Sequence, residues 1–164
     1  MMLIRVANQM DLPALIEIYN QAIEAGHQTA HLDPVTVASR QTWFDEHMER
    51  DQLLLVSVDE DQVLGYLTLS AYRRGRRALQ KTKEVSMYIH RDYQRRGIAS
   101  ALLEYALELC IKMDITSLMT IMLATNQPSI AFFKNKGFEV WGQLPGVAEI
   151  ENKPVDQIYM GRQV

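Results

Sequence analysis

Residues 94–100 carry the groups best suited to holding an anion, and they read Gln-Arg-Arg-Gly-Ile-Ala-Ser. An alternating apolar and polar segment precedes them and a long apolar segment with helical spacing follows, which predicts a strand–loop–helix junction. The first N–H groups of a helix lack partners and carry partial positive charge, so an anion placed there satisfies both. Gly97 lets a ligand approach the backbone closely, and the arginines add charged donors for phosphate oxygens. The predicted phosphate-binding residues are Gln94, Arg95, Arg96, Gly97, Ile98, Ala99 and Ser100; the alternative is a basic turn that only caps a helix.

A second group of candidate residues lies further along the chain, around a predicted short helix. Asn126 and Ser129 stand at its start, and the run Lys136-Gly137-Phe138 follows its last turn. An asparagine in this place either caps the helix that contains Pro128 or hydrogen-bonds to a ligand.

These two groups resemble the cofactor motifs of the GNAT acetyltransferase superfamily. Gln94, Gly97 and Ala99 match the family pattern Q/R-x-x-G-x-G/A, and residues 126–138 resemble N-x-x-A/S…K-x-G-F. In that family the loop amides hold the coenzyme A pyrophosphate, and the preceding strand pairs with the pantetheine arm. The resemblance therefore adds Met87, Tyr88, Ile89, Asn126, Ser129 and Phe133 to residues 94–100 as expected acetyl-CoA contacts.

A closer resemblance is to the phosphinothricin acetyltransferase-like branch. It is carried by Thr82-x-Glu84-x-Ser86-x-Tyr88 and by the run Ile-Tyr-Asn at residues 18–20. That branch acetylates the primary amine of small amino-acid-like compounds. The resemblance implies an acetyl-CoA-dependent N-acetyltransferase in which a small-molecule amine attacks the thioester directly in a ternary complex. The alternatives are a protein or peptide N-acetyltransferase and a catalytically silent acyl-CoA-binding module.

The expected chemistry needs a base, a donor to the thioester oxygen and a path for the thiolate. Glu84 is the candidate base, directly or through a water; the alternative is a carboxylate paired with Lys81 or Lys83. Backbone N–H groups near Tyr88 and Ile89 are the expected oxyanion donors.

The thiolate side departs from the family pattern. Phe133 stands where many members have a tyrosine and where the phosphinothricin branch has a histidine, and phenylalanine has no proton to give. We expect the thiolate to leave without help from the protein. The alternatives are that Tyr88 or a water supplies the proton, or that activity is lost.

The surrounding elements predict one mixed α+β domain over residues 1–164. In the GNAT fold, this is a central, mostly antiparallel, splayed sheet flanked by helices. Asp11 is the expected N-cap of the first helix, and Gly65 is a possible bulge. Strands are expected at 3–7, 52–58, 63–71, 82–90, 117–124, 138–141 and 155–161, and helices at 11–26, 34–50, 98–113 and 128–136. The two strands around helix 98–113 are expected to be parallel.

Composition narrows the function classes. The formal net charge of −3 argues against broad nucleic-acid binding, and no apolar run is long enough to span a bilayer. The single cysteine, Cys110, excludes an internal disulfide and fits a reducing compartment, so we expect a cytoplasmic protein.

Two further clusters each have a structural and a functional interpretation. His27 and His31 are four residues apart, but Gly26 and Pro34 make this stretch a loop, so we expect no metal site and instead a wall of the acceptor pocket. The four arginines at 73–77 are expected in a solvated hairpin loop, with phosphate contacts as the alternative. The family resemblance makes a homodimer plausible.

Overall fold

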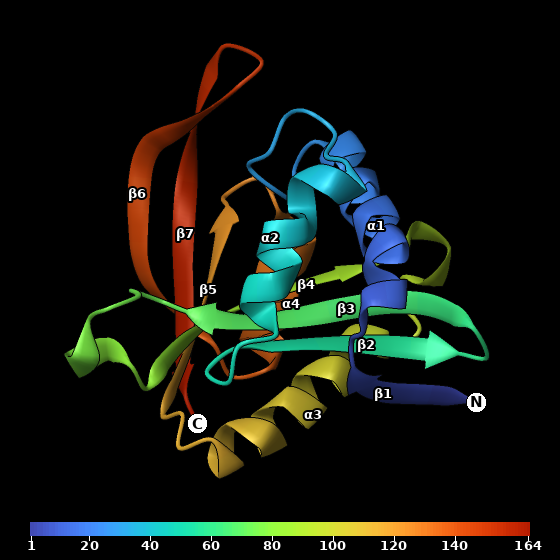
Figure 1. Cartoon of the computed structure of the whole chain (residues 1–164). Coiled ribbons are helices and arrows are strands. Elements are labelled where there is room, and N and C mark those ends of the chain that lie inside the picture. Colours follow the sequence, from blue (N-terminus) through green and yellow to red (C-terminus); the bar gives the residue numbers. More distant parts are fainter.

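The computed structural model describes residues 1–164 and contains four α-helices and seven strands in the predicted order (Figure 1). Three short 3-10 turns, η1 (Gln9–Asp11), η2 (Arg77–Leu79) and η3 (Arg91–Tyr93), lie in the connections. In chain order the other elements are β1 (Met2–Val6), α1 (Leu12–Ala25), α2 (Val37–His47), β2 (Leu53–Asp59), β3 (Gln62–Ala71), β4 (Thr82–Ile89), α3 (Ile98–Lys112), β5 (Ser117–Leu123), α4 (Gln127–Asn135), β6 (Glu139–Ile150) and β7 (Lys153–Gln163).

All seven strands belong to one sheet with the order β1-β2-β3-β4-β5-β7-β6. Every neighbouring pair is antiparallel except β4 and β5, which are parallel as predicted. These two strands pair only over Thr82–Glu84 and Ser117–Met119, after which they diverge (Figure 1). The predicted fold class, a mostly antiparallel splayed sheet flanked by helices, is therefore confirmed.

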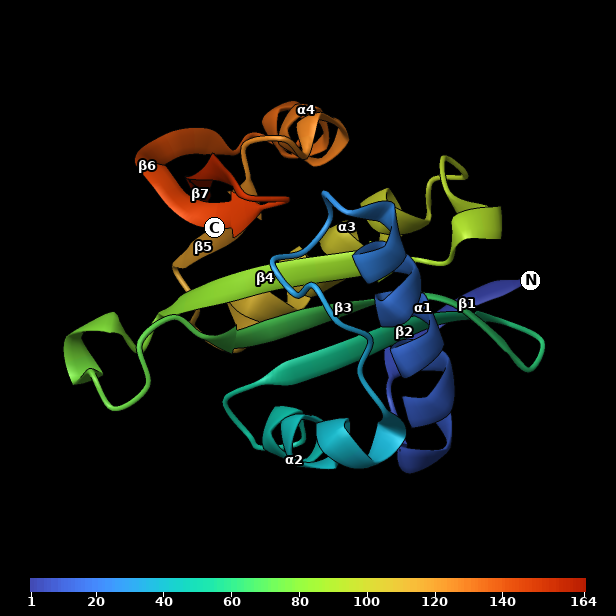
Figure 2. The same cartoon turned by 90° about the horizontal axis from the view of Figure 1, so that it is seen from above.

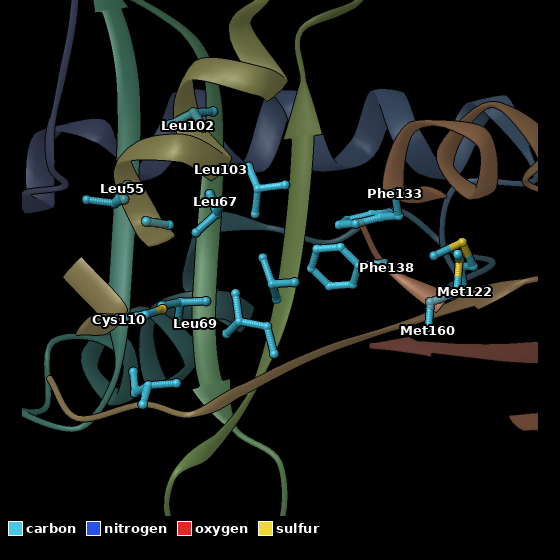
Figure 3. Close-up of a cluster of buried hydrophobic side chains, with 14 of the residues drawn as sticks. Leu55, Leu67, Leu69, Leu102, Leu103, Cys110, Met122, Phe133, Phe138 and Met160 are labelled. Carbon is cyan, nitrogen blue, oxygen red and sulfur yellow. The ribbon is translucent and has the colours of Figure 1, made fainter. Parts of the chain in front are cut away.

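The sheet carries helices on both faces because its central strands are apolar on both sides. Along β2, Leu54 and Val56 pack with residues of α1 and α2, whereas Leu55 between them packs with residues of α3. Figure 3 shows the hydrophobic cluster on the α3 side of the sheet, in which Leu102 and Leu103 of α3 face the sheet. Figure 2 shows α2 and α3 separated by the strands. The helices thereby fix β4, which runs between both cores.

The first helix begins where it was predicted, but the second does not. Asp11 is the N-cap residue of α1, yet its side chain does not cap the helix; it accepts hydrogen bonds from Arg5 at 2.7 and 2.9 Å and closes a capping box with Asn8 instead. The second helix begins at Val37 rather than near Pro34, because the Thr36 hydroxyl accepts from the Ser39 N–H while Ser39 accepts from the Thr36 N–H.

The last two strands are much longer than the predicted 138–141 and 155–161. They form a hairpin that extends well beyond the rest of the sheet (Figure 1). Most residues of β6 are exposed, and its pairing with β7 shifts register between Val140 and Gly142 and again between Leu144 and Ala148. A solvated, irregular strand has no clean alternation of apolar residues, so the pattern marks only its start.

The irregularity predicted near Gly65 lies one residue away. Ser57 of β2 pairs with Gly65 and the next residue, Val58, pairs with Val63, which leaves Leu64 as the extra residue of a bulge. Gly65 has a different role: a Cβ there would lie 2.6 Å from Ile89 Cδ1 and 3.0 Å from the Tyr88 carbonyl oxygen. The glycine thus permits a close approach of β3 to the end of β4.

Cys110 of α3 is buried and free, and burial raises the pKa of its thiol to about 11. None of the helices combines the length and apolar character needed to cross a membrane.

Candidate active site

The loop between η3 and α3 presents a row of backbone donors. Arg95 and Gly97 both have positive φ, 59° and 80°, and Gly97 is the residue before the first turn of α3. None of the backbone N–H groups from Arg95 to Ser100 donates to another group of the protein. Because these groups lie at a helix N-terminus, they form a site for an anion. A Cβ at Gly97 would meet no atom within 4 Å, so the space in front of the loop is open.

This loop forms one end of a cavity of about 530 Å³ between α3, α4 and the end of β4. Of the residues predicted to contact acetyl-CoA, twelve line it: Met87, Tyr88, Ile89, Gln94, Arg95, Gly97, Ile98, Ala99, Ser100, Asn126, Ser129 and Phe133. Arg96 does not line the cavity. Its guanidinium lies over the ring of Tyr93, 5.1 Å from the centroid.

Five further residues line this cavity: His27, Gln28, Tyr93, Pro128 and Phe132. Sequence reasoning placed His27 in the acceptor pocket instead and did not single out the other four as cavity residues. Tyr93, Pro128 and Phe132 adjoin the two motifs, so an aromatic or proline next to each motif was the available signal. His27 and Gln28 come from the loop after α1, and no local pattern connects that loop to α3.

The parting of β4 and β5 creates the second feature of the site. Glu84 and Met119 are the last paired residues, and from Val85 to Ile89 strand β4 pairs with β3 on one side only. The other edge of β4 therefore has free backbone groups that an extended ligand can pair with, in the manner of an added strand.

A smaller cavity of about 370 Å³ opens beside this edge. The polar part of its wall comes from β4, from β7 and from the loop between α1 and α2, and β5 adds apolar side chains. The residues that line the cavity are Gln28, Thr29, Ala30, His31, Glu84, Ser86, Tyr88, Ile121, Met122, Leu123, Gln157 and Tyr159. Gln28 and Tyr88 line both cavities. The two cavities therefore meet at Tyr88, a short distance along β4 from Glu84.

Comparison with known proteins identifies this arrangement. A family model described as an acetyltransferase (GNAT) domain matches residues 4–159. The chain belongs to the GNAT acetyltransferase family.

Individual GNAT relatives match nearly the whole chain. YwnH of Bacillus subtilis, described provisionally as a phosphinothricin acetyltransferase, is 36% identical over 163 residues, 99% of each chain. The L-methionine sulfoximine/L-methionine sulfone acetyltransferase of Pseudomonas aeruginosa is 31% identical over 160 residues, covering 96% of this chain and 91% of the relative. The solved phosphinothricin acetyltransferase of Sinorhizobium meliloti in complex with AcCoA is 26% identical, with a TM-score of 0.92 over 99% of this chain and 88% of that one.

The GNAT enzyme is thus an N-acetyltransferase, and its acyl donor is acetyl-CoA. The relatives confirm the predicted likeness to the phosphinothricin acetyltransferase branch. No group of His, Cys, Asp and Glu side chains in the structure has an arrangement that could hold a metal ion.

Glu84 of this GNAT site has no ion-pair partner. Lys81 pairs with Asp114, and Lys83 pairs with Asp51 at 3.7 Å, so the alternative of a structural pair with either lysine is wrong. Burial raises the pKa of the Glu84 carboxyl, because the charged form loses water without gaining a cation. A half-buried carboxylate with a raised pKa and a free face in a cavity is suited to accept a proton.

Tyr88 is more deeply enclosed. Burial raises the pKa of its hydroxyl far above the usual value, neighbouring Tyr19 and Glu84 raise it further, and the nearby Thr29 side chain lowers it. Its ring contacts those of Tyr19 and Tyr66, with centroids 5.1 and 5.5 Å apart. The Tyr88 hydroxyl therefore stays protonated over the physiological pH range and can donate a hydrogen bond where the cavities meet.

Two residues that line the cavity near α4, Asn126 and Phe133, also stabilise the fold. The Asn126 side chain accepts from the Ser129 N–H at 3.4 Å, so it caps α4 as well as facing the cavity. Phe133 is 5% exposed and packs edge-on against Phe132 and Phe138; Figure 3 shows the rings of Phe133 and Phe138 side by side. The cavity presents no hydroxyl at position 133.

The arginine cluster lies elsewhere. Arg73, Arg74, Arg76 and Arg77 line a separate cavity at the start of β4, opposite the end that leads to the anion-binding loop. Arg74 pairs with Glu46 and Glu49 of α2 and the loop that follows it. These arginines do not take part in the wall of the 530 Å³ cavity.

Proposed function

We propose that this GNAT enzyme transfers the acetyl group of acetyl-CoA to the primary amine of a small amino-acid-like acceptor, by direct attack in a ternary complex. The observation that carries the proposal is the meeting of the two cavities at Tyr88, beside a partnerless Glu84. A donor in one cavity and an acceptor in the other bring thioester and amine together at this point.

The donor is held in the larger cavity. The free N–H groups of residues 95–100 bind the pyrophosphate, and Arg95 adds a charged donor. The pantetheine arm lies along the open edge of β4 at Met87, Tyr88 and Ile89, with Asn126, Ser129 and Phe133 on its other side.

The chemistry uses Glu84 as the base. Its carboxylate takes a proton from the acceptor ammonium, directly or through a water, and the free amine attacks the thioester carbon. A backbone N–H near Tyr88 or Ile89 stabilises the charge on the thioester oxygen. As the C–S bond breaks, the sulfur leaves with the electron pair, and holding both reactants in place supplies much of the rate.

The acceptor cavity supports a small polar amine. Its charged and titratable lining consists of one carboxylate, Glu84, one imidazole, His31, and the hydroxyls of Tyr88 and Tyr159, with amide and hydroxyl groups between them. A volume of about 370 Å³ suits a molecule of amino-acid size. The names of the Bacillus and Pseudomonas relatives point to phosphinothricin and to methionine sulfoximine or sulfone as acceptors of this size.

A homodimer is part of the same proposal. Strand β6 is an edge of the sheet and exposes Val140, Trp141 and Val147, which are 50%, 44% and 57% accessible. An exposed edge strand with apolar side chains is a surface that a second copy can cover. Light scattering on purified protein tests it: a mass of one chain at micromolar concentration contradicts the dimer.

The central test is acetyl-CoA-dependent thiol release over a panel of amines. The panel holds phosphinothricin, L-methionine sulfone, L-methionine sulfoximine, the protein L-amino acids, and a peptide with a free N-terminus. Turnover on one or more small amines, with none on the peptide, supports the proposal. Binding of acetyl-CoA by calorimetry without turnover on any amine would leave only the silent acyl-CoA-binding module.

A further inference from the structure

The cavity at the start of β4, which we name the basic cavity, has a volume of about 600 Å³. Its wall is formed by the connection between β3 and β4, by the loop between α2 and β2 and by the turn after α3. Figure 2 shows the β3–β4 connection, in green, at the opposite end of β4 from the connection to α3. Seven positive and two negative side chains line the cavity: Arg50, Arg73, Arg74, Arg76, Arg77, Lys81, Lys83, Asp51 and Asp114. The positive charge is concentrated here although the formal net charge of the chain is −3.

Carboxylates of the protein neutralise only part of this charge. Arg74 pairs with Glu46 and Glu49, and Lys81 pairs with Asp114. Four further arginines of the wall have no carboxylate within 4.0 Å and no side-chain hydrogen bond to the protein. They are Arg50, Arg73, Arg76 and Arg77. Because all four are exposed, they would by themselves make only a solvated positive surface.

Lys83 distinguishes the basic cavity from a solvated loop. It is a residue of β4, and its side chain is only 5% exposed. Its Nζ makes no hydrogen bond to the protein, and the nearest carboxylate oxygen, Asp51 Oδ2, is 3.7 Å away on a side chain that is 60% exposed. Burying an ammonium group is costly unless the group is both paired and hydrogen-bonded. Because Lys83 lines the cavity, an anion bound there can supply the hydrogen bonds that the protein does not.

The basic cavity is separate from the site of acetyl transfer. Successive side chains of a strand point to opposite faces of the sheet, so Lys83 and Glu84 point away from each other. Lys83 shares its face with Val85, which packs with residues of α3, whereas Glu84 faces the acceptor cavity together with Ser86 and Tyr88. No residue of the basic cavity lines either of the other two cavities. A ligand of the basic cavity can therefore bind at the same time as the donor and the acceptor.

We propose that the basic cavity binds a small anion with two or three linked phosphoryl groups, either inorganic or at the end of a nucleotide. Guanidinium groups donate paired hydrogen bonds to phosphate oxygens, so several arginines on one loop suit such a ligand. A single carboxylate would occupy one arginine and leave the other arginines and Lys83 without a partner. A chain of phosphoryl groups carries several charges and has oxygens on all sides, so it can contact the exposed arginines and the buried Lys83 together. This site goes beyond the proposed acetyl transfer, and its occupation does not depend on the acceptor.

The test is calorimetry with sodium tripolyphosphate and with ATP, each titrated into protein that is saturated with acetyl-CoA. Acetyl-CoA occupies the loop of residues 94–100, so a phosphate chain cannot bind there. The wild type is expected to bind at least one of the two compounds, with one molecule per chain. Tighter binding of ATP identifies a nucleotide as the source of the phosphate chain, and tighter binding of tripolyphosphate identifies an inorganic source.

Three variants locate the ligand, each measured with the compound that binds more tightly. Lys83→Met keeps the bulk of the side chain and removes its charge; loss of a charge-assisted hydrogen bond corresponds to about 10- to 100-fold weaker binding. Arg76→Gln/Arg77→Gln changes only exposed side chains, so it tests the site even if Lys83→Met does not fold, and binding should weaken by about tenfold or more. The control Lys134→Gln/Lys153→Gln removes two positive charges from exposed side chains outside the cavity and should bind as the wild type does.

A reciprocal pair of variants separates the basic cavity from the anion-binding loop. Gly75 lines the cavity, Gly97 lies in the loop, and both have positive φ. Gly75→Asp should weaken binding of the phosphate compound and leave the Kd for acetyl-CoA unchanged, and Gly97→Asp should do the reverse. The proposal is overturned if neither compound binds the wild type, if the arginine double variant or a folded Lys83→Met binds as tightly as the wild type, or if Gly97→Asp abolishes binding of the phosphate compound as well. An enzyme that acetylates no amine overturns the proposed function alone, because these titrations contain no acceptor.

Discussion

Glu84 and Met119 are the last residues paired between β4 and β5, and the strands part directly after them. The candidate base therefore stands at the apex of the opening, with its carboxylate facing the acceptor cavity and the free edge of β4 leading on toward the donor. The same local feature makes room for a ligand and leaves a carboxylate half-buried without a partner. Both consequences can be measured at this one residue.

The first prediction concerns turnover. Glu84→Gln keeps the size of the side chain and removes its ability to accept a proton, so kcat is expected to fall by about 10²- to 10⁴-fold while the Kd for acetyl-CoA stays the same. Wild-type activity should fall as pH drops through the raised pKa of Glu84, and the variant should lack this acid limb. Steady-state kinetics and calorimetry provide both numbers; a variant with wild-type kcat would exclude Glu84 as the base.

The second prediction concerns stability. Burial raises the pKa of Glu84 in the folded protein above its unfolded value, so the folded state binds more protons between the two values. Stability from this group is therefore fully present below the unfolded pKa and is lost as pH rises through the folded pKa. Glu84→Gln should raise the midpoint of thermal unfolding above the folded pKa and have no effect below the unfolded pKa. An equal effect at both ends of the pH range would point to packing instead.

The third prediction concerns the anion-binding loop. Gly97 and Gly75 both have positive φ, 80° and 75°, and a Cβ at either position would meet no atom within 4 Å. An aspartate therefore introduces similar backbone strain at each, of about 1 kcal/mol. Only Gly97→Asp places a negative charge and a side chain where the pyrophosphate is expected, so it should weaken acetyl-CoA binding by more than 100-fold at equal loss of stability. Calorimetry that finds both variants binding alike would remove the loop as the phosphate site.

The sequence was informative where a function depends on neighbours along the chain. Residues 95–100 present consecutive free N–H groups, so the arginines and glycine that shape the loop are visible as one short pattern. Glu84 and Tyr88 were chosen through the resemblance to the phosphinothricin acetyltransferase-like branch, and alternation along one strand places both residues on one face. The buried strand 117–123 was likewise clear from its unbroken apolar run.

What the sequence did not reveal depends on contacts between distant segments. Gln28 reaches both cavities from the loop after α1, and only the packing of α1 on β4 brings it there. Asp11 is at the predicted N-cap position of α1, but its carboxylate accepts from Arg5 of β1 rather than from the helix, and no local pattern predicted this ion pair. The hairpin of β6 and β7 is solvated, so the burial pattern that reveals a strand is missing from most of it.

The last prediction returns to Phe133, whose ring packs against Phe138 and also faces the donor cavity. Phe133→Tyr adds a hydroxyl to the wall of the donor cavity, next to the place expected for the departing sulfur. If protonation of the thiolate limits turnover, the new hydroxyl should raise kcat while the Kd for acetyl-CoA stays the same. The hydroxyl lies next to apolar rings, and an unsatisfied buried hydroxyl costs about 1–3 kcal/mol, so a lower unfolding midpoint is expected as well. Steady-state rates and thermal unfolding of the variant and the wild type measure both effects. A variant with unchanged kcat would show that proton supply to the sulfur does not limit turnover.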